Sequence, residues 1–368
     1  RVRGDGPRLL DSRCIGCTQC AVACPDGVFG IGSADARDLD GTGSVLVVPR
    51  GFLASFAAEP AAVLAALSDL GFTQVRCTEE WERALRLEAL DRAGRSDGPI
   101  IAPSCPAIAA LVEARFPGLL GRMALLASPL AAAAAEFPLH RLVAVPACPA
   151  QREAVRRESR AGRIATVAPA DLAAAVLPLL AGGAKGIAAA AGVPAAAAGV
   201  PAAAAEAAAP AVADPEADGV LRVTGLRHVV RVLELAEAGA LPGVRLLEPF
   251  ACDGGCLGSP YLGADPFVAA HRLALACLPP GTTSPTAPAA VARRRPRVPR
   301  AGSRLHPDMA TAIGMLGAID EAARSLPGRD CGSCGAPSCA AFAEDLVLGR
   351  AGASDCPHRT RPLGGRIP

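Results

Sequence analysis

The chain has 368 residues, a formal net charge of +2 and a hydrophobic fraction of 51%. This length allows two or three domains, and so small a charge leaves no electrostatic footprint for a nucleic-acid partner. Aromatic residues make up only 3% of the chain, so alanine-rich packing must fill the core. The uncharged run 186–205 is nearly all Ala and Gly and contains Pro194 and Pro201. Because Ala inserts poorly into membranes and proline breaks helices, we expect no membrane span.

Cysteine is the most informative residue type in this sequence. The fourteen cysteines lie at 14, 17, 20 and 24, at 105 and 148, at 252 and 256, and at 331, 334, 339 and 356, while Cys77 and Cys277 stand apart. Cysteines spaced as C-x-x-C seldom form disulfides with each other and favour metal ligation. The grouping therefore predicts metal clusters in a reducing compartment, and we expect a cytoplasmic protein.

The first group has the spacing C-x2-C-x2-C-x3-C-P and comprises Cys14, Cys17, Cys20, Cys24 and Pro25. This is the spacing with which bacterial ferredoxins hold a [4Fe–4S] cluster. The preceding residues 1–13 resemble the hairpin between the two halves of a two-cluster ferredoxin, so we expect another cysteine run upstream. Cys24 would then serve that upstream cluster, and a cysteine outside this sequence would complete the cluster of the other three. We assign residues 1–35 to a ferredoxin-like domain that is truncated at its N-terminal side.

Strands and helices alternate after the ferredoxin-like run. We predict strands at 44–49 and 72–77 and helices at 60–70 and 79–93. Pro60 begins the first helix, Ala and Leu recur within it at helical spacing, and Gly71 ends it. The alternation indicates an α/β domain. Cys77 lies in the second strand, and we interpret it as a core residue.

Two single cysteines each follow a predicted strand. Cys105 comes after the strand 100–102, and Cys148 comes after an apolar run that begins at Leu142; a helix follows each of them. Sites in α/β folds lie at the carboxyl ends of strands. Both cysteines are therefore candidates for one site.

The stretch 248–260, EPFACDGGCLGSP, carries a further pair, Cys252 and Cys256. Gly254 and Gly255 let the backbone turn tightly, so that both thiolates can converge on one object. Two buried structural cysteines are the alternative interpretation of this pair. Together with the two strand-end cysteines, the pair makes a set of four thiolates.

Segments 99–131, 142–153 and 220–275 resemble the catalytic (H-cluster) domain of [FeFe] hydrogenases. Among these they look most like a divergent, sensory group of iron hydrogenase large subunit, C-terminal-domain proteins. The resemblance implies a two-lobed α/β domain at 36–280 that holds a [4Fe–4S] cubane. The ligands that it implies are Cys105, Cys148, Cys252 and Cys256. By the same resemblance, Cys256 would also bridge to a diiron subcluster.

Four positions depart from this resemblance. Ser104 replaces a proton-relaying cysteine, and Gln151 replaces a lysine that binds a cyanide of the diiron unit. Pro146 and Phe250 replace methionines. A hydroxyl is a far poorer proton shuttle than a thiol near neutral pH, because its pKa lies far from the working pH. We therefore expect no fast turnover and assign no catalytic residue, although Ser104 holds the proton-relay position.

We interpret two segments as an insertion and a linker. Residues 179–219 are a low-complexity insertion rich in Ala and Pro, and residues 281–304 are a linker rich in Pro and Arg. We expect both to lack a packed core. The basic run 292–300 of the linker could bind an acidic partner, but we favour a solvated linker.

The last domain spans 305–368 and carries the cysteine spacing C-x2-C-x4-C-x16-C. These cysteines are Cys331, Cys334, Cys339 and Cys356. We predict helices at 308–326 and 338–350. The spacing resembles the small [4Fe–4S] domain of ion-pumping electron-transfer complexes and of corrinoid iron–sulfur proteins, with zinc as the alternative metal.

Three functions remain open from the sequence. All assume a multi-cluster iron–sulfur redox protein with three [4Fe–4S] clusters. The first is ferredoxin-linked hydrogenase chemistry at a slow rate, and the second is sensing of H2 or redox state. The enzyme and the H2 sensor both need the diiron unit. The third is electron transfer or cluster scaffolding without a diiron unit. The expected partners are ferredoxin or another redox protein and, for a sensor, a signalling kinase or phosphatase.

Overall fold

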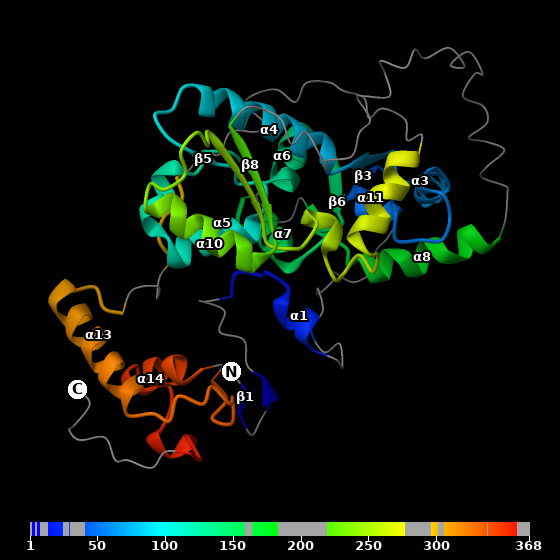
Figure 1. Ribbon diagram of the computed structural model, residues 1–368. Helices are drawn as coiled ribbons and strands as arrows, with labels where there is room; N and C mark the ends of the chain where they lie inside the picture. The colour runs from blue at the N-terminus through cyan, green and yellow to red at the C-terminus, as the bar shows by residue number, and fades with distance from the viewer. Residues whose placement is uncertain are drawn as a thin grey trace. The chain divides into compact units, whose positions relative to one another are not determined.

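The computed structural model describes residues 2–3, 6–7, 14–24, 29, 41–158, 164–182, 219–276, 296–300, 305–336 and 338–358. The chain divides into two compact units, one of Arg1–Cys14 with Pro299–Pro368 and one of Ile15–Val298 (Figure 1). Cys277, most of the predicted insertion 179–219 and most of the predicted linker 281–304 lie outside the described residues.

The larger unit contains two parallel sheets. The first has the order β4-β3-β6-β7 and is formed by β3 (Ser44–Val48), β4 (Gln74–Cys77), β6 (Arg141–Ala144) and β7 (Ile164–Thr166). The second has the order β5-β9-β8 and is formed by β5 (Ile100–Ile101), β8 (Val220–Thr224) and β9 (Leu246–Phe250). Every pairing in both sheets is parallel, with Val45 opposite Leu142 and Ile100 opposite Leu246. The predicted α/β class is therefore confirmed.

Helices connect these strands, as parallel pairing requires. They are α1 (Gln19–Ala23), α2 (Arg50–Leu53), α3 (Pro60–Ser68), α4 (Glu79–Gly94), α5 (Pro106–Arg115), α6 (Pro129–Glu136), α7 (Pro149–Glu158), α8 (Pro169–Ala181), α10 (Leu226–Glu237) and α11 (Pro266–Leu275), with the short 3-10 helices η2 (Pro117–Arg122) and η6 (Gly255–Gly258). Six of the α-helices begin with proline, whose fixed φ suits the first helical position. This signal explains why the start of α3 at Pro60 was predictable.

Two predicted boundaries shift for a local reason. Helix α3 ends at Ser68 rather than at residue 70, and β4 begins at Gln74 rather than at residue 72. Between them Gly71 has φ +86°, which turns the chain, and the Thr73 N–H donates to the Ser44 carbonyl at 2.9 Å. The turn therefore occupies residues that the sequence pattern divided between helix and strand.

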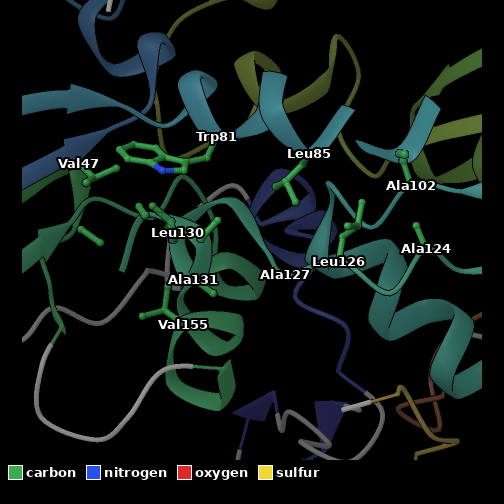
Figure 2. Close-up of a cluster of buried hydrophobic side chains, with 14 of the residues drawn as sticks. Val47, Trp81, Leu85, Ala102, Ala124, Leu126, Ala127, Leu130, Ala131 and Val155 are labelled. Carbon is green, nitrogen blue, oxygen red and sulfur yellow. The ribbon is translucent and has the colours of Figure 1, made fainter. Parts of the chain in front are cut away.

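A buried cluster joins the two sheets (Figure 2). It contains Val47 of β3, Leu246 of β9 and the fully buried Trp81 of α4. The Trp81 indole Nε1 donates to Glu136 Oε2 at 2.9 Å, so its one polar atom is satisfied. Burial of such side chains contributes about 1.5–3 kcal/mol each.

Arg297, within the predicted linker, makes an ion pair with the larger unit's helix α5. The Arg297 guanidinium lies 3.0 Å from Glu113 Oε1 of α5, and the two side chains are only 9% and 11% exposed. Both side chains of this ion pair are largely shielded from solvent. The composition of the linker could not reveal this contact.

The smaller unit contains an antiparallel pair, β1 (Val2–Arg3) and β2 (Gly6–Pro7), and a helical part. The helices are α13 (Met309–Arg324), α14 (Cys339–Val347) and the 3-10 helix η7 (Ala353–Asp355). Asp308 caps α13 by accepting from the Thr311 N–H at 2.8 Å, and Ser338 caps α14 by accepting from the Ala341 N–H at 3.1 Å. The core between α13 and α14 is small and centres on Phe342.

Across the described parts of both units, none of the helices combines the length and the apolar character needed to cross a membrane.

Candidate metal centre

A cavity lies in the larger unit where strands of both sheets end. Cys105 follows β5, Cys252 follows β9, and Cys148 follows β6 of the other sheet. These three residues and Cys256 line one cavity, which encloses about 350 Å3 of empty space including its mouth. The predicted set of four thiols is thus brought together from three strand ends.

Cys105 is the N-cap of α5 and is 7% exposed. Burial raises the pKa of its thiol, while the N–H groups of Ala251, Ile108 and Ala107 act in the opposite direction on that pKa. Two of these N–H groups belong to the first turn of α5, where the helix dipole also favours negative charge. Cys105 is therefore largely shielded from solvent, and fixed dipoles at the helix start still favour its thiolate form.

Cys148 repeats this arrangement at the start of α7. Burial raises the pKa of the Cys148 thiol to about 12, and backbone N–H groups of Gln151 and Ala150 again act to lower it. Cys105 and Cys148 therefore each lie at a helix start where backbone N–H groups interact with the sulfur.

Cys252 and Cys256 sit on either side of the glycine turn. Gly254 and Gly255 both have φ +72°, and the Gly255 N–H donates to the Cys252 carbonyl at 3.1 Å. Burial raises the pKa of Cys252 to about 11 and that of Cys256 well above its usual value. Metal binding must therefore displace protons from all four thiols.

Gly254→Ala is expected to disrupt this turn. An added Cβ would lie 2.6 Å from Pro266 Cβ at the start of α11, in addition to the left-handed backbone strain. Gly263 is a matched control because it has the same φ of +72° and nothing within 4 Å of an added Cβ. We expect Gly254→Ala to lower the free energy of unfolding by about 1–3 kcal/mol more than Gly263→Ala does. Denaturant unfolding followed by Trp81 fluorescence measures both, and equal losses would contradict the close contact.

Two of the four positions that depart from the hydrogenase resemblance line the cavity, namely Gln151 and Phe250. Gln151 Nε2 donates to Cys256 Sγ at 3.8 Å, and its Oε1 accepts from the Ala147 N–H at 2.7 Å. The described lining does not include Ser104 or Pro146.

The cysteines of the first run fall in both compact units. Cys17 lines the cavity beside the set of four, whereas Cys20 is exposed and Cys24 is partly buried. Cys14 belongs to the smaller unit, where its carbonyl accepts a hydrogen bond from Arg300 Nη1 at 2.6 Å. The place of Cys17 in the cavity was not expected from the ferredoxin spacing.

The terminal cysteines surround the small core of α13 and α14. Cys334, Cys339 and Cys356 pack against it, while Cys331 is exposed. The Cys339 N–H donates to Asp330 Oδ1 at 2.6 Å, and hydrogen bonds from Ser333 lower the pKa of Cys331. Gly332 and Gly335, both at positive φ, turn the chain between the cysteines.

Two acids near the cavity were missed in the sequence, where they look like the solvated face of a charged helix. Burial raises the pKa of Glu79, and burial together with the Glu79 charge raises the pKa of Glu82 to about 8. Glu82 acts on both Cys256 and Cys105 electrostatically. Glu82 is thus a titratable acid beside two of the four thiols, and its raised pKa of about 8 favours the neutral form near pH 7.

Among the described residues, no group of three or more His, Cys, Asp or Glu side chains could hold a single metal ion. A [4Fe–4S] cube differs because each thiolate binds a different iron, so its ligands do not converge on one point. Four clustered soft thiols, two of which interact with peptide N–H groups, suit such a cluster chemically and suit a hard cation poorly.

An α/β unit with clustered strand-end thiols, joined to a small cysteine-bearing helical unit, has the features of an iron–sulfur protein. Residues 326–358 match the family model described as "FeS: Putative Fe-S cluster", a segment that spans all four terminal cysteines. This match supports an iron–sulfur cofactor in that segment. A search of curated proteins finds no match to the chain.

Several solved structures of [FeFe]-hydrogenases are similar to the chain. HydA(deltaEFG), from work on stepwise H-cluster assembly, is 14% identical with a TM-score of 0.43, over 64% of this chain and 84% of that one. A HydA1 variant from Chlamydomonas reinhardtii is 14% identical with a TM-score of 0.46, over 63% and 84%. An apo HydA1 variant from the same organism is 14% identical with a TM-score of 0.42, over 69% and 86%. With every score below 0.5, the assignment of the site rests on the cysteine geometry instead.

Proposed function

We propose that this protein is an iron–sulfur redox protein whose larger unit holds a [4Fe–4S] cluster. The ligands are Cys105, Cys148, Cys252 and Cys256. The observation that carries this proposal is the single cavity in which thiols from three separate strand ends meet. Such a cluster, when bound, takes up and releases one electron at a time.

The surroundings of the cavity explain how the protein would use this cluster. The cavity walls are mostly apolar, and the N–H groups of the α5 and α7 starts interact with the sulfurs of Cys105 and Cys148. Hydrogen bonds to cluster sulfurs stabilise the extra electron and raise the reduction potential. The Gln151 amide adds a side-chain donor at Cys256.

Two further clusters complete the proposal. Cys331, Cys334, Cys339 and Cys356 would hold one in the terminal domain, which we place at 305–368. Cys14, Cys17, Cys20 and Cys24 supply ligands for ferredoxin-type clusters in the domain 1–35. The chain would then exchange electrons with ferredoxin or another redox protein.

The finer proposal concerns a diiron unit bridged by Cys256. With that unit the protein would sense H2 or redox state, or carry out slow ferredoxin-linked H2 chemistry; a sensor would also need a signalling kinase or phosphatase. The alternative is an electron-transfer or scaffold protein without the unit. The neutral amide of Gln151, already hydrogen-bonded to Cys256, favours this alternative because it brings no positive charge to the cavity.

Infrared spectroscopy of fully matured protein decides between these functions. A diiron unit gives bands of bound CO and cyanide, and we expect these bands to disappear in Cys256→Ala. H2 uptake measured on the same sample then separates slow turnover from sensing. Matured protein that contains its [4Fe–4S] clusters but no such bands would contradict both H2 chemistry and H2 sensing, and would favour electron transfer or scaffolding.

A further inference from the structure

The segment that precedes α1 forms part of the wall of the buried cavity. Gly16 and Cys17 both line it. At Gly16, where φ is +71°, an added Cβ would lie 2.7 Å from the Ala150 backbone nitrogen. Only glycine permits this approach, so the ferredoxin-type run is packed tightly onto the start of α7.

Thr18, two residues after Gly16, also has a positive φ, of 65°, and only 3% of this residue is exposed. A β-branched residue in this region is a strained outlier, and glycine would remove the strain. Unlike Gly16, however, Thr18 has a side chain with a polar contact. Its Oγ1 lies 2.6 Å from the Cys17 carbonyl oxygen and 3.7 Å from Cys252 Sγ.

The Thr18 hydroxyl has one proton and two acceptors within reach. When Cys252 is a protonated thiol, the hydroxyl donates to the Cys17 carbonyl and can accept from the thiol. When Cys252 is a metal-bound thiolate, it has no proton to give, and the hydroxyl can turn to donate to its sulfur. Thr18 therefore stands between the backbone of Cys17 and the side chain of Cys252.

We propose that Thr18 is a positioning residue that raises the reduction potential of the buried cluster by donating a hydrogen bond to Cys252 Sγ. This inference rests on the proposed function of the four-thiol cavity. Reduction adds negative charge to the cluster and its sulfurs, so the bond strengthens in the reduced state. Because Thr18 belongs to the ferredoxin-type run, the conformation of that run affects the hydrogen bond to Cys252 and hence the reduction potential of the buried cluster.

The test is a redox titration, followed by electron paramagnetic resonance, of the full chain reconstituted anaerobically with iron and sulfide. The buried cluster's signal is the one that Cys105→Ala abolishes. Thr18→Val keeps the size and branching but lacks the hydroxyl. We expect the ratio of reduced to oxidised cluster at a fixed potential to fall about tenfold, a shift of 59 mV to more negative potential for one electron.

Two further variants separate the hydrogen bond from the backbone. Thr18→Ser keeps the hydroxyl and should retain the wild-type potential. Thr18→Gly removes the hydroxyl and also the strain, so it should fold at least as well as the wild type and still show the Val shift. Equal potentials in the wild type and in Thr18→Gly would overturn the role of Thr18 while leaving the cluster in place. If instead no signal depends on Cys105, the buried cluster itself is refuted, and this inference with it.

Discussion

Cys105→Ala is expected to remove the iron and sulfide of one [4Fe–4S] cluster from the reconstituted protein and to leave the terminal cluster intact. Cys105 is the N-cap of α5 and lies at the inner wall of the cavity, so no other side chain on α5 can replace it as a ligand. Loss of one of four thiolates exposes an iron of the cluster to displacement. Iron and acid-labile sulfide per chain, with the EPR signal of the remaining clusters, measure this loss.

Cys77→Ala is the matched control for that experiment. Cys77 ends β4 and packs against the core beside Val48 and Leu67 rather than lining the cavity. Burial raises its pKa to about 12, as burial also does for Cys148. The iron content of Cys77→Ala should therefore equal that of the wild type. Simultaneous loss of the terminal cluster in Cys105→Ala would count against separate cluster sites.

Removal of metal from the terminal domain is expected to unfold α13 and α14 while the larger unit stays folded. The core between these helices consists of a few side chains around Phe342, with Cys334, Cys339 and Cys356 packed on it. Domains of about 60 residues are marginal without staples, and metal binding in such domains contributes to folding directly, by about 10–16 kcal/mol for structural zinc in peptides. The expected effect is therefore loss of the fold rather than a small shift in stability.

Two signals report on the two units separately. The chain has a single tryptophan, Trp81, which is fully buried in the larger unit. Hydrogen exchange of the α14 amides should become fast in Cys339→Ala, while Trp81 fluorescence stays native. Ser333→Ala is the control, because it changes a neighbouring polar side chain and keeps all four thiols. Slow exchange across α14 in metal-free protein would contradict this prediction, because it would show that the small core keeps α14 folded without metal.

Much of the fold could be predicted because its signals are local. Proline at helix starts and the apolar run of β3 mark elements within a few residues. Cys105 and Cys148 could each be predicted as a site residue, since each follows a strand. The rule does not explain why they meet, because β5 and β6 belong to different sheets.

Other features of the larger unit depend on contacts between segments that are distant in the sequence. The ferredoxin spacing assigns Cys17 to its own cluster and does not reveal that Cys17 also lines the buried cavity. Nothing local at Arg297 indicates its buried partner Glu113. Glu82 looks like one more charge on a charged helix, and only the packing around α4 makes it a half-buried acid with a raised pKa. In each case the deciding partner is far away in the sequence.

Iron anomalous diffraction from crystals of the anaerobically reconstituted chain tests the central claim most directly. We predict an anomalous peak from four irons inside the cavity, with the irons bonded to the sulfurs of Cys105, Cys148, Cys252 and Cys256. A cavity without iron, in a crystal whose terminal cysteines do hold a cluster, would contradict it.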